Sequence, residues 1–466
     1  MPQDVARRLK DCLANEDGFV ELRYHAKTSR AVTIENGRVE SSGIRHRTGT
    51  GIRVLKGGVF GFASCSSADP KDVTKAIQQA RSAAEKSAAK RREKIDGLAV
   101  CDLATGHFEL PGVDDVLNRT LEEKIGLARE VEAQTRKAAQ KVSTATCMYR
   151  EILEEKAIVT TDGAACSFRL VRPEFRISAM AENGGERQSS SRTIGVTGGW
   201  DCLFKDRPPE QLAHEAAGTA VDLLAAKRPE GGRATVILAP SIVGLLVHEA
   251  IGHTVEADFV QSGSVAQGKL GKRVGSDLVT LCDSGLSEYH EGAGGSLPVD
   301  DEGVPTQRTV IIQNGVLKSY LHDRTTAARF GATPTGSARA WEYSDVPLIR
   351  MRNTYLEPGE STLEEMIAGT QDGYLLDGPR NGQADATGEF MFNVERAWRI
   401  RGGRKGELLR GLTISGIAFD VMHTVDAVSR EFKWDLGAGY CGKGQPAKVD
   451  AGGPYVRCQV LLGGDQ

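Results

Sequence analysis

Two histidines five positions apart, with a glutamate directly after the first, constrain the fold of this chain more than any other feature. They stand in the sequence His-Glu-Ala-Ile-Gly-His of residues 248–253. Residues on a regular α-helix advance by about 100° each, so His248 and His253 would diverge by about 140° and could not bind one ion together. We therefore expect the helix between them to be widened toward i→i+5 hydrogen bonds, or broken. Gly252 supplies backbone freedom for that distortion.

This pattern predicts a catalytic metal site. Imidazole is the side chain that most often binds metal ions near neutral pH, and a glutamate beside a ligating histidine is where metallohydrolases keep the general base. The alternative is a pair of buried core histidines, but a chain with nine histidines rarely contains this motif by chance. The preceding residues favour the metal, because residues 234–239 indicate a buried strand and residues 242–247 an apolar helix with Ser241 as its N-cap.

A catalytic zinc site needs a third protein ligand, since its fourth position stays open for water or substrate. The sequence offers Glu256, Asp258, Cys282, Cys441 and Cys458. Cys441 lies in a glycine-rich segment, residues 436–445, that we expect to be a loop, and Lys443 would help to keep its sulfur deprotonated. The residues alone leave two interpretations of Cys441 open: a thiolate ligand, or a small buried apolar side chain.

Several motifs resemble those of the TldD/PmbA family of zinc metallopeptidases, also called modulators of DNA gyrase, and in particular its metal-bearing TldD-type branch. The matching segments run through most of the chain: residues 54–63, 161–163, 248–258, 300–303, 334–336, 351–355 and 441–443. The most specific of them is H-E-x-x-x-H followed far downstream by Cys-Gly-Lys. The resemblance implies that His248, His253 and Cys441 bind one Zn²⁺ per active chain and that Glu249 is the catalytic base.

The resemblance also implies a substrate and an assembly. A chain of this type would act as a metalloprotease on short or unfolded peptides, inside a cavity enclosed by a dimer. It would form a heterodimer with a metal-free TldE/PmbA-type relative, or a homodimer. The sequence departs from the family pattern after Lys443, which is followed directly by Gly444 and Gln445. That departure leaves an alternative open: a zinc-dependent amide hydrolase that acts on a small molecule or a modified amino acid in a biosynthetic pathway.

Composition argues against other classes of function. The net charge of −3, with both signs interspersed, predicts neither a nucleic-acid partner nor a membrane surface. The nine cysteines are scattered and do not indicate a disulfide framework. The first ten residues indicate the start of an amphipathic helix rather than a signal peptide. We therefore expect a cytoplasmic protein.

The order of predicted elements indicates an α+β fold. We expect an N-terminal mixed α/β domain over residues 1–230 and a β-rich C-terminal domain over residues 231–466 that carries the metal-binding helix. The charged segment 227–232, which ends in Gly-Gly, is the expected boundary. Residues 300–303, Asp-Asp-Glu-Gly, indicate a turn ahead of a strand rather than a second carboxylate site.

Local signals predict individual elements in both halves. Asn36-Gly37, Gly57-Gly58 and Asn314-Gly315 predict β-hairpins. Helices are expected over residues 70–90, with Asp69 as cap, and over residues 114–139 and 209–226. Further strands are expected over residues 157–181, with a turn at Asp162-Gly163, and over residues 389–401 and 406–415, which would complete the sheet that carries the Cys441 loop.

Overall fold

The computed structural model describes residues 2–435 and 437–464, and the fold is α+β. Its N-terminal half is built on one long, curved sheet with the strand order β3-β2-β1-β5-β6-β4, to which β7 adds by pairing with β6. Most neighbours are antiparallel, whereas β4 and β6 are parallel. The strands are β1 (Phe19–Glu35), β2 (Arg38–Lys56), β3 (Val59–Cys65), β4 (Thr105–Glu109), β5 (Val142–Thr160), β6 (Ala165–Asn183) and β7 (Glu186–Gly195).

The predicted turns form where the sequence places them. Asn36 and Gly37 join β1 to β2 with φ of 48° and 80°, the left-handed pair that a tight hairpin turn requires. Gly57-Gly58 joins β2 to β3, and Asp162-Gly163 lies between β5 and β6. The strands themselves are longer than predicted, because β1, β5 and β6 pair along almost their whole length.

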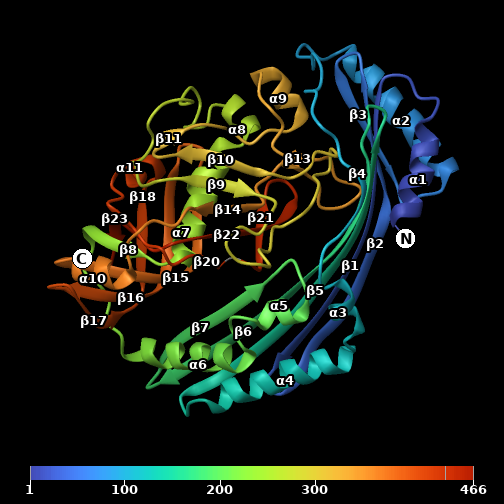
Figure 1. Ribbon diagram of the computed structural model, residues 1–466. Coiled ribbons are helices and arrows are strands. Elements are labelled where there is room, and N and C mark those ends of the chain that lie inside the picture. Colours follow the sequence, from blue (N-terminus) through green and yellow to red (C-terminus); the bar gives the residue numbers. More distant parts are fainter. Residues whose placement is uncertain (1, 436, 465–466) are drawn as a thin grey trace.

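Helices cover the convex face of this sheet (Figure 1). They are α1 (Pro2–Leu13), α2 (Pro70–Ala88), α3 (Val113–Asn118), α4 (Leu121–Lys137), α5 (Trp200–Phe204) and α6 (Pro209–Ala225). α2 begins as predicted, since the Asp69 carboxylate accepts a hydrogen bond from the Lys71 N–H at 2.9 Å. The single helix predicted over residues 114–139 is wrong. The chain breaks there because Thr120 and Glu123 form a capping box that starts α4 anew.

The C-terminal half contains two larger sheets. One has the order β11-β10-β9-β14-β22-β20, with β21 on β22, and the other has the order β15-β8-β23-β18-β16-β17. In the second sheet β15 also pairs with β16, so five strands close into a ring. A two-stranded sheet joins β12 (Ala338–Arg339) to β13 (Leu348–Ile349).

The bounds of the larger sheets follow from the pairing. The first contains β9 (Leu281–Ser284), β10 (Arg308–Gln313), β11 (Val316–Leu317), β14 (Asn353–Leu356), β20 (Lys433–Trp434), β21 (Gly439–Gly442) and β22 (Pro446–Gly453). The second contains β8 (Gly232–Leu238), β15 (Asp372–Ala384), β16 (Glu389–Arg401), β17 (Arg404–Leu409), β18 (Leu412–Ile417), β19 (Ala427–Val428) and β23 (Val456–Gly463). The strand predicted at 389–401 is β16, whereas the strand predicted at 406–415 is divided at residues 410–411 into β17 and β18. All three lie in the second sheet and not in the one that carries Cys441, which corrects the prediction.

One helix connects the two sheets. β8 leads into α7 (Pro240–Leu246), which packs against both β22 and β15. α7 begins at Pro240 after Ala239, and the Ser241 hydroxyl instead donates to the Asp377 carboxylate at 3.2 Å, so the N-cap predicted for Ser241 is wrong. The shorter helices are α8 (Ala257–Gln261), α9 (Arg324–Phe330), α10 (Leu363–Ala368) and α11 (Ala418–His423). Across the described ranges, no helix has both the length and the apolar content needed to cross a membrane.

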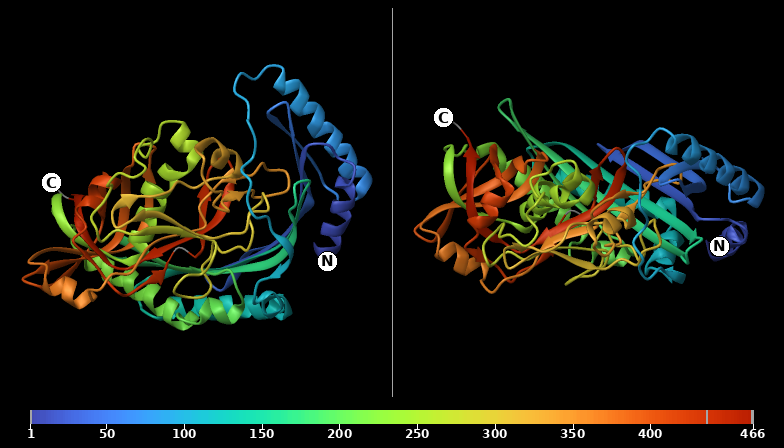
Figure 2. Two further views of the ribbon diagram at one scale, coloured as in Figure 1. Left: turned by 45° about the horizontal axis from the view of Figure 1, so that its top comes forward. Right: turned by 90° about the horizontal axis from the view of Figure 1, so that it is seen from above.

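The C-terminal half rests against the concave face of the N-terminal sheet (Figure 2). Residues 300–303 form the predicted turn, but its carboxylates are fully buried at this contact. Asp301 accepts hydrogen bonds from Lys156 of β5 at 2.8 Å, and Glu302 accepts one from Arg53 of β2 at 2.8 Å. The division of the chain at residue 230 into two domains stays a prediction.

Candidate metal centre

The helix that carries the two histidines is widened between them. α7 continues into a π-helical turn, Val247–Gly252, and the N–H of His253 donates to the carbonyl oxygen of His248, which is the i→i+5 bond that the spacing predicts. A 3₁₀ turn, His253–Val255, follows. The two imidazole rings therefore lie on the same side, with centroids 5.4 Å apart and planes at 81°.

Gly252 is needed for packing rather than for conformational freedom. Its φ of −54° and ψ of −47° are right-handed helical values that any residue adopts. A Cβ at this position would overlap the sulfur of Met351, which is fully buried. The interpretation of Gly252 as a flexible point is therefore wrong, and the glycine allows the helix to approach the segment before β14.

Cys441 lies beside the two histidines although it is remote in sequence. It stands on β21, which pairs antiparallel with β22, so residues 439–442 form a strand where the sequence predicts a loop; residue 436 of that segment lies outside the described residues. The Cys441 Sγ is 3.0 Å from the His253 Nε2. One ligand atom from each of His248, His253 and Cys441 lies within 4.8 Å of the others. For comparison, the donor atoms around a tetrahedral zinc ion are about 3.5 Å apart.

A buried arginine of the C-terminal half holds the hairpin that β21 and β22 form. Arg350, which is fully buried, donates to the carbonyl oxygen of Cys441 at 2.6 Å and to that of Gln445 at 2.8 Å. These bonds fix the backbone on both sides of the hairpin turn. Nothing in the sequence around Arg350 indicates this role, because both acceptors are backbone atoms about ninety residues away.

The local electrostatics favour a thiolate at Cys441. Burial raises the pKa of the Cys441 thiol, but the imidazoles of His248 and His253 outweigh burial and lower that pKa to about 5. Burial lowers the pKa of His253, whereas its contacts with Cys441 and Glu256 raise it to about 10. A cysteine binds a metal ion as the thiolate, and the two neighbouring imidazoles favour that form of Cys441.

Glu256 and Lys443 support the site from behind His253. The Glu256 carboxylate is 3.0 Å from the His253 Nδ1, the ring nitrogen that points away from Cys441. Lys443 donates to Glu256 at 3.1 Å and to the Ile349 carbonyl at 3.1 Å, and it pairs with Asp258 at 2.7 Å. The prediction that Lys443 keeps the Cys441 sulfur deprotonated is therefore wrong, because the Lys443 ammonium group pairs with Glu256 and Asp258 instead.

The other candidates for a third ligand lie elsewhere or have other partners. Cys282 packs with Tyr355 and Phe432 in a separate apolar cluster, and Cys458 is buried on β23. Glu256 contacts the far side of His253, and Asp258 pairs with Lys443. Of the five candidates that the sequence offers, Cys441 is the one that clusters with both histidines.

Glu249 lies at the open side of this cluster. Its carboxylate oxygen is 3.7 Å from the His253 Nε2, and its side chain is 32% exposed, whereas His248 is buried. The Phe259 ring packs edge-on against the His253 ring at 6.1 Å between centroids. The Glu249 carboxylate is therefore both close to one of the three donors and accessible to solvent.

The residues present fit a zinc ion. Within residues 2–435 and 437–464, the Cys441 sulfur is the one hydrogen-bonding group that the buried His248 ring approaches, and no hydrogen bond of good geometry reaches either ring nitrogen. A buried imidazole in this state is costly unless it binds something else. Two imidazoles and one thiolate are the mixed nitrogen and sulfur donors that zinc prefers. Glu256 completes the carboxylate–histidine arrangement that commonly orients a metal-binding imidazole.

Three patterns of one protein family match this chain. The pattern for "PmbA/TldA metallopeptidase C-terminal domain" matches residues 231–462, and those for domain 1 and the central domain match residues 20–84 and 114–224. The chain belongs to the PmbA/TldD family. As a member of this family it is a metallopeptidase, and all three clustered residues lie within the C-terminal domain.

Known relatives of this PmbA/TldD-family chain are metalloproteases. A metalloprotease of Methanocaldococcus jannaschii is 34% identical over 448 residues, which cover 94% of this chain and 95% of the relative. A TldD homologue of Haemophilus influenzae is 30% identical and covers 96% and 93%. A protein of Saccharolobus solfataricus named as a zinc metalloprotease TldD homologue is 28% identical and covers 95% and 96%.

Solved structures of the family share the fold. A Thermotoga maritima protein named as a modulator of a DNA gyrase matches with a TM-score of 0.81 at 22% identity, over 99% of this chain and 100% of its own. TldE of Thermococcus kodakarensis matches with a TM-score of 0.78 at 17% identity, over 99% and 100%. At these identities the likeness concerns the fold alone.

Proposed function

We propose that this chain is a zinc-dependent peptidase in which His248, His253 and Cys441 hold one Zn²⁺ and Glu249 acts as general base. The observation that carries the proposal is the cluster of three donor atoms within 4.8 Å of one another, two of them on buried residues, with the partly exposed Glu249 carboxylate 3.7 Å from one of them. The name of the zinc metalloprotease relative in Saccharolobus solfataricus supports the choice of metal.

Each side chain has a defined part in the reaction. A zinc ion bound here supplies Lewis acidity, which polarises a peptide carbonyl and acidifies water. The Glu249 carboxylate takes the proton of the attacking water and passes it to the leaving amine. Glu256 would accept the hydrogen bond of the His253 Nδ1 proton when an ion displaces the proton of Nε2, and this leaves the Nε2 lone pair for the ion.

We further propose that the substrates are short or unfolded peptides and that cleavage takes place in a cavity enclosed by a dimer. A peptide in extended conformation can add to a sheet edge by main-chain hydrogen bonds. The common fold with TldE of Thermococcus kodakarensis supports a metal-free TldE/PmbA-type relative as the partner, with a homodimer as the other option. The proposed compartment is the cytoplasm.

Replacement of Glu249 by glutamine tests the base. The variant keeps the shape of the side chain and all three donors, so we expect one zinc per chain, measured by elemental analysis, and a loss of peptide turnover of about 100- to 10,000-fold. Turnover is measured on an unstructured peptide, for the chain alone and with its TldE/PmbA-type relative. Full turnover with bound zinc refutes the assignment of Glu249. If the wild type hydrolyses small amide conjugates but no peptides, the peptidase assignment is wrong and the small-amide hydrolase takes its place.

A further inference from the structure

The strand that carries Cys441 lies between the metal-binding helix and the N-terminal sheet. Side chains alternate along β21, so Cys441 faces the histidines while its neighbour Tyr440 faces the opposite way. The Tyr440 hydroxyl donates to the carboxylate of Glu174, which stands in the middle of β6. One residue of the N-terminal sheet therefore contacts the immediate neighbour of Cys441.

Glu174 also anchors the second strand of the hairpin. Lys448 of β22 stands directly opposite Tyr440, and its ammonium group donates to Glu174 at 2.8 Å. Both partners are buried, with 1% of the Lys448 side chain and 3% of the Glu174 side chain exposed. One carboxylate thus receives a hydrogen bond from each strand of the hairpin, at the position next to Cys441.

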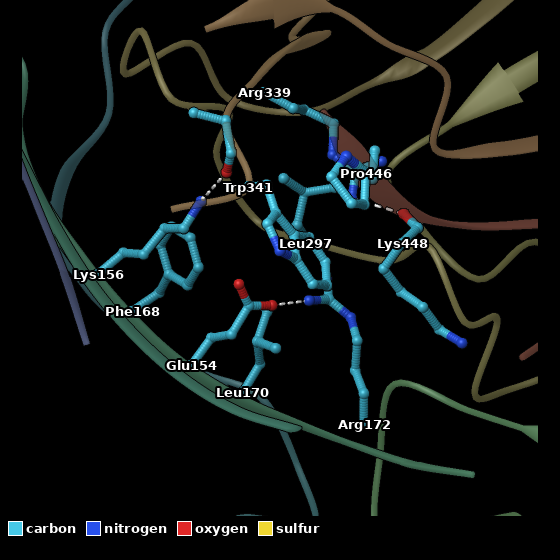
Figure 3. A pocket seen from close by; sticks show the side chains of 12 residues that line it. Glu154, Lys156, Phe168, Leu170, Arg172, Leu297, Arg339, Trp341, Pro446 and Lys448 are labelled. Atoms are coloured by element: carbon cyan, nitrogen blue, oxygen red, sulfur yellow. Dashed lines mark hydrogen bonds and ion pairs between the residues drawn. The ribbon is translucent and has the colours of Figure 1, made fainter. Parts of the chain in front are cut away.

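The surrounding contacts allow the hairpin little movement. Arg150 of β5, which pairs with Glu174 in the sheet, lies over the Tyr440 ring at 4.9 Å. A Cβ on Gly437 would overlap the carbonyl oxygen of Gly195, so the chain before β21 lies directly against the end of β7. Figure 3 shows the adjoining part of this contact, where Glu154 pairs with Arg172. The cavity that lies there between the sheet and residues 446–448 has a volume of about 20 Å³. That volume holds about one water molecule, so this contact is a joint and not a substrate pocket.

We infer that Glu174 is a positioning residue for the metal centre: through Tyr440 and Lys448, the N-terminal sheet sets the place of the Cys441 sulfur. The inference rests on the proposed function, in which Cys441 is a ligand. The physical reason is that hydrogen bonds are directional. Those to a buried carboxylate fix both distance and angle, whereas apolar contacts would allow small shifts of the hairpin. Residues that orient a metal ligand typically change metal affinity by about 10- to 100-fold when they are replaced.

The chain contains a matched control for this residue. Glu151, on the convex face of the same sheet, also accepts hydrogen bonds from a tyrosine hydroxyl and a lysine: Tyr149 at 2.6 Å and Lys124 at 2.7 Å. Its side chain is 4% exposed, close to the value for Glu174. Glu151 also accepts a hydrogen bond from Arg30 at 3.0 Å, so its cluster has one more cation than that of Glu174. Glu151→Gln removes the same chemical group from a buried cluster of similar chemistry, on the side away from the metal centre.

The experiment compares full-length wild type, Glu174→Gln, Glu151→Gln and Cys441→Ser after loading with Co²⁺ or Zn²⁺. The Co²⁺ protein is followed by its thiolate-to-cobalt absorption band, and Zn²⁺ affinity by competition with a chelator. We expect Glu174→Gln to shift or weaken the band and to bind zinc at least about tenfold more weakly. Glu151→Gln should lower the thermal midpoint to a similar extent but keep the wild-type band and affinity. Tyr440→Phe, which removes one hydrogen bond and keeps the ring, should give a smaller change in the same direction, and it replaces Glu174→Gln if that variant does not fold.

Each contrary outcome has a different meaning. A wild-type band and affinity in Glu174→Gln or, if that variant does not fold, in Tyr440→Phe overturns the inference and leaves the proposed function intact. Equal changes in Glu174→Gln and Glu151→Gln also overturn it, because the effect is then one of general stability. A full band in Cys441→Ser overturns the proposed ligand set itself, and the role of Glu174 with it.

Discussion

The two faces of the N-terminal sheet differ in the balance between apolar packing and buried charge, although they share the same strands. Along β1, Leu22 points to the convex face and packs in an apolar cluster with residues of α1 and α2. The next residue, Arg23, points to the concave face, where it is fully buried and contacts Asp301 at 3.7 Å. The convex face is mainly an apolar core with a buried charged cluster at Glu151. The concave face is held mainly by buried charges, beside a smaller apolar cluster that includes Leu170 and Leu297.

The difference teaches what each face contributes. Apolar burial stabilises the fold in proportion to area and specifies geometry loosely. Buried ion pairs add little net stability, because desolvation offsets the attraction, but they are costly to break and they require one arrangement. The helices on the convex face therefore stabilise the sheet, whereas the charges on the concave face fix where the C-terminal half, and with it the Cys441 hairpin, lies.

Removal of the Asp301 carboxylate is the strongest test of whether buried charges hold the concave face. Asp301→Ala leaves Lys156 and Arg23 buried without their counter-charge, so we expect the free energy of unfolding to fall by about 3–5 kcal/mol. Urea denaturation measures this. The Co²⁺ band of the folded variant should change as well, since the joint that positions the hairpin is disturbed. A loss below about 1 kcal/mol would mean that the charges are not a joint.

A replacement on the convex face gives the contrast. Leu22 is fully buried, and Leu22→Ala leaves a cavity that should lower the free energy of unfolding by about 3 kcal/mol. Here we expect the Co²⁺ band and the zinc affinity of the folded protein to equal those of wild type. If both variants alter the metal centre equally, the two faces do not differ in the way described.

The smallest expected effect is on the pH dependence of stability. Burial raises the pKa of Asp301, but Lys156 and Arg23 outweigh burial and lower that pKa to about 2 from the usual 3.8. A carboxyl group whose pKa is lowered by folding stabilises the protein above the unfolded pKa and loses that contribution as the pH falls through the folded one. Asp301 should thus contribute about 2 kcal/mol at neutral pH, lost between about pH 4 and pH 2. The difference in stability between wild type and Asp301→Asn should narrow over that window, and a constant difference would contradict the assignment.

Much of the fold follows from local signals in the sequence. Asn36-Gly37 and Asn314-Gly315 form hairpin turns because few other pairs adopt left-handed conformations readily. Asp69 caps α2 as predicted. The break before α4 had a signal too, since Thr120 and Glu123 have the spacing of a capping box, but the apolar periodicity on both sides masks it.

In the candidate site, too, features with a local sequence signal were predicted and features that depend on distant segments were not. The spacing of His248 and His253 predicts a widened helix, because the requirement is local geometry. Cys441 could be matched to them only by resemblance, since its strand reaches the helix through pairing between distant segments. Glu174 and Arg350 were not predicted at all, because each acts on atoms between about ninety and nearly three hundred residues away and neither leaves a pattern in its own neighbourhood.

Lys443 has a consequence for how the protein acquires its metal. It joins the hairpin to the end of the helix through Glu256, and Glu256 in turn orients His253. All of these contacts are between protein groups, so they join His253 to the hairpin without an ion. For the proposed zinc site this predicts that metal loading follows folding, and that loss of the ion removes activity without reducing the amount of folded chain.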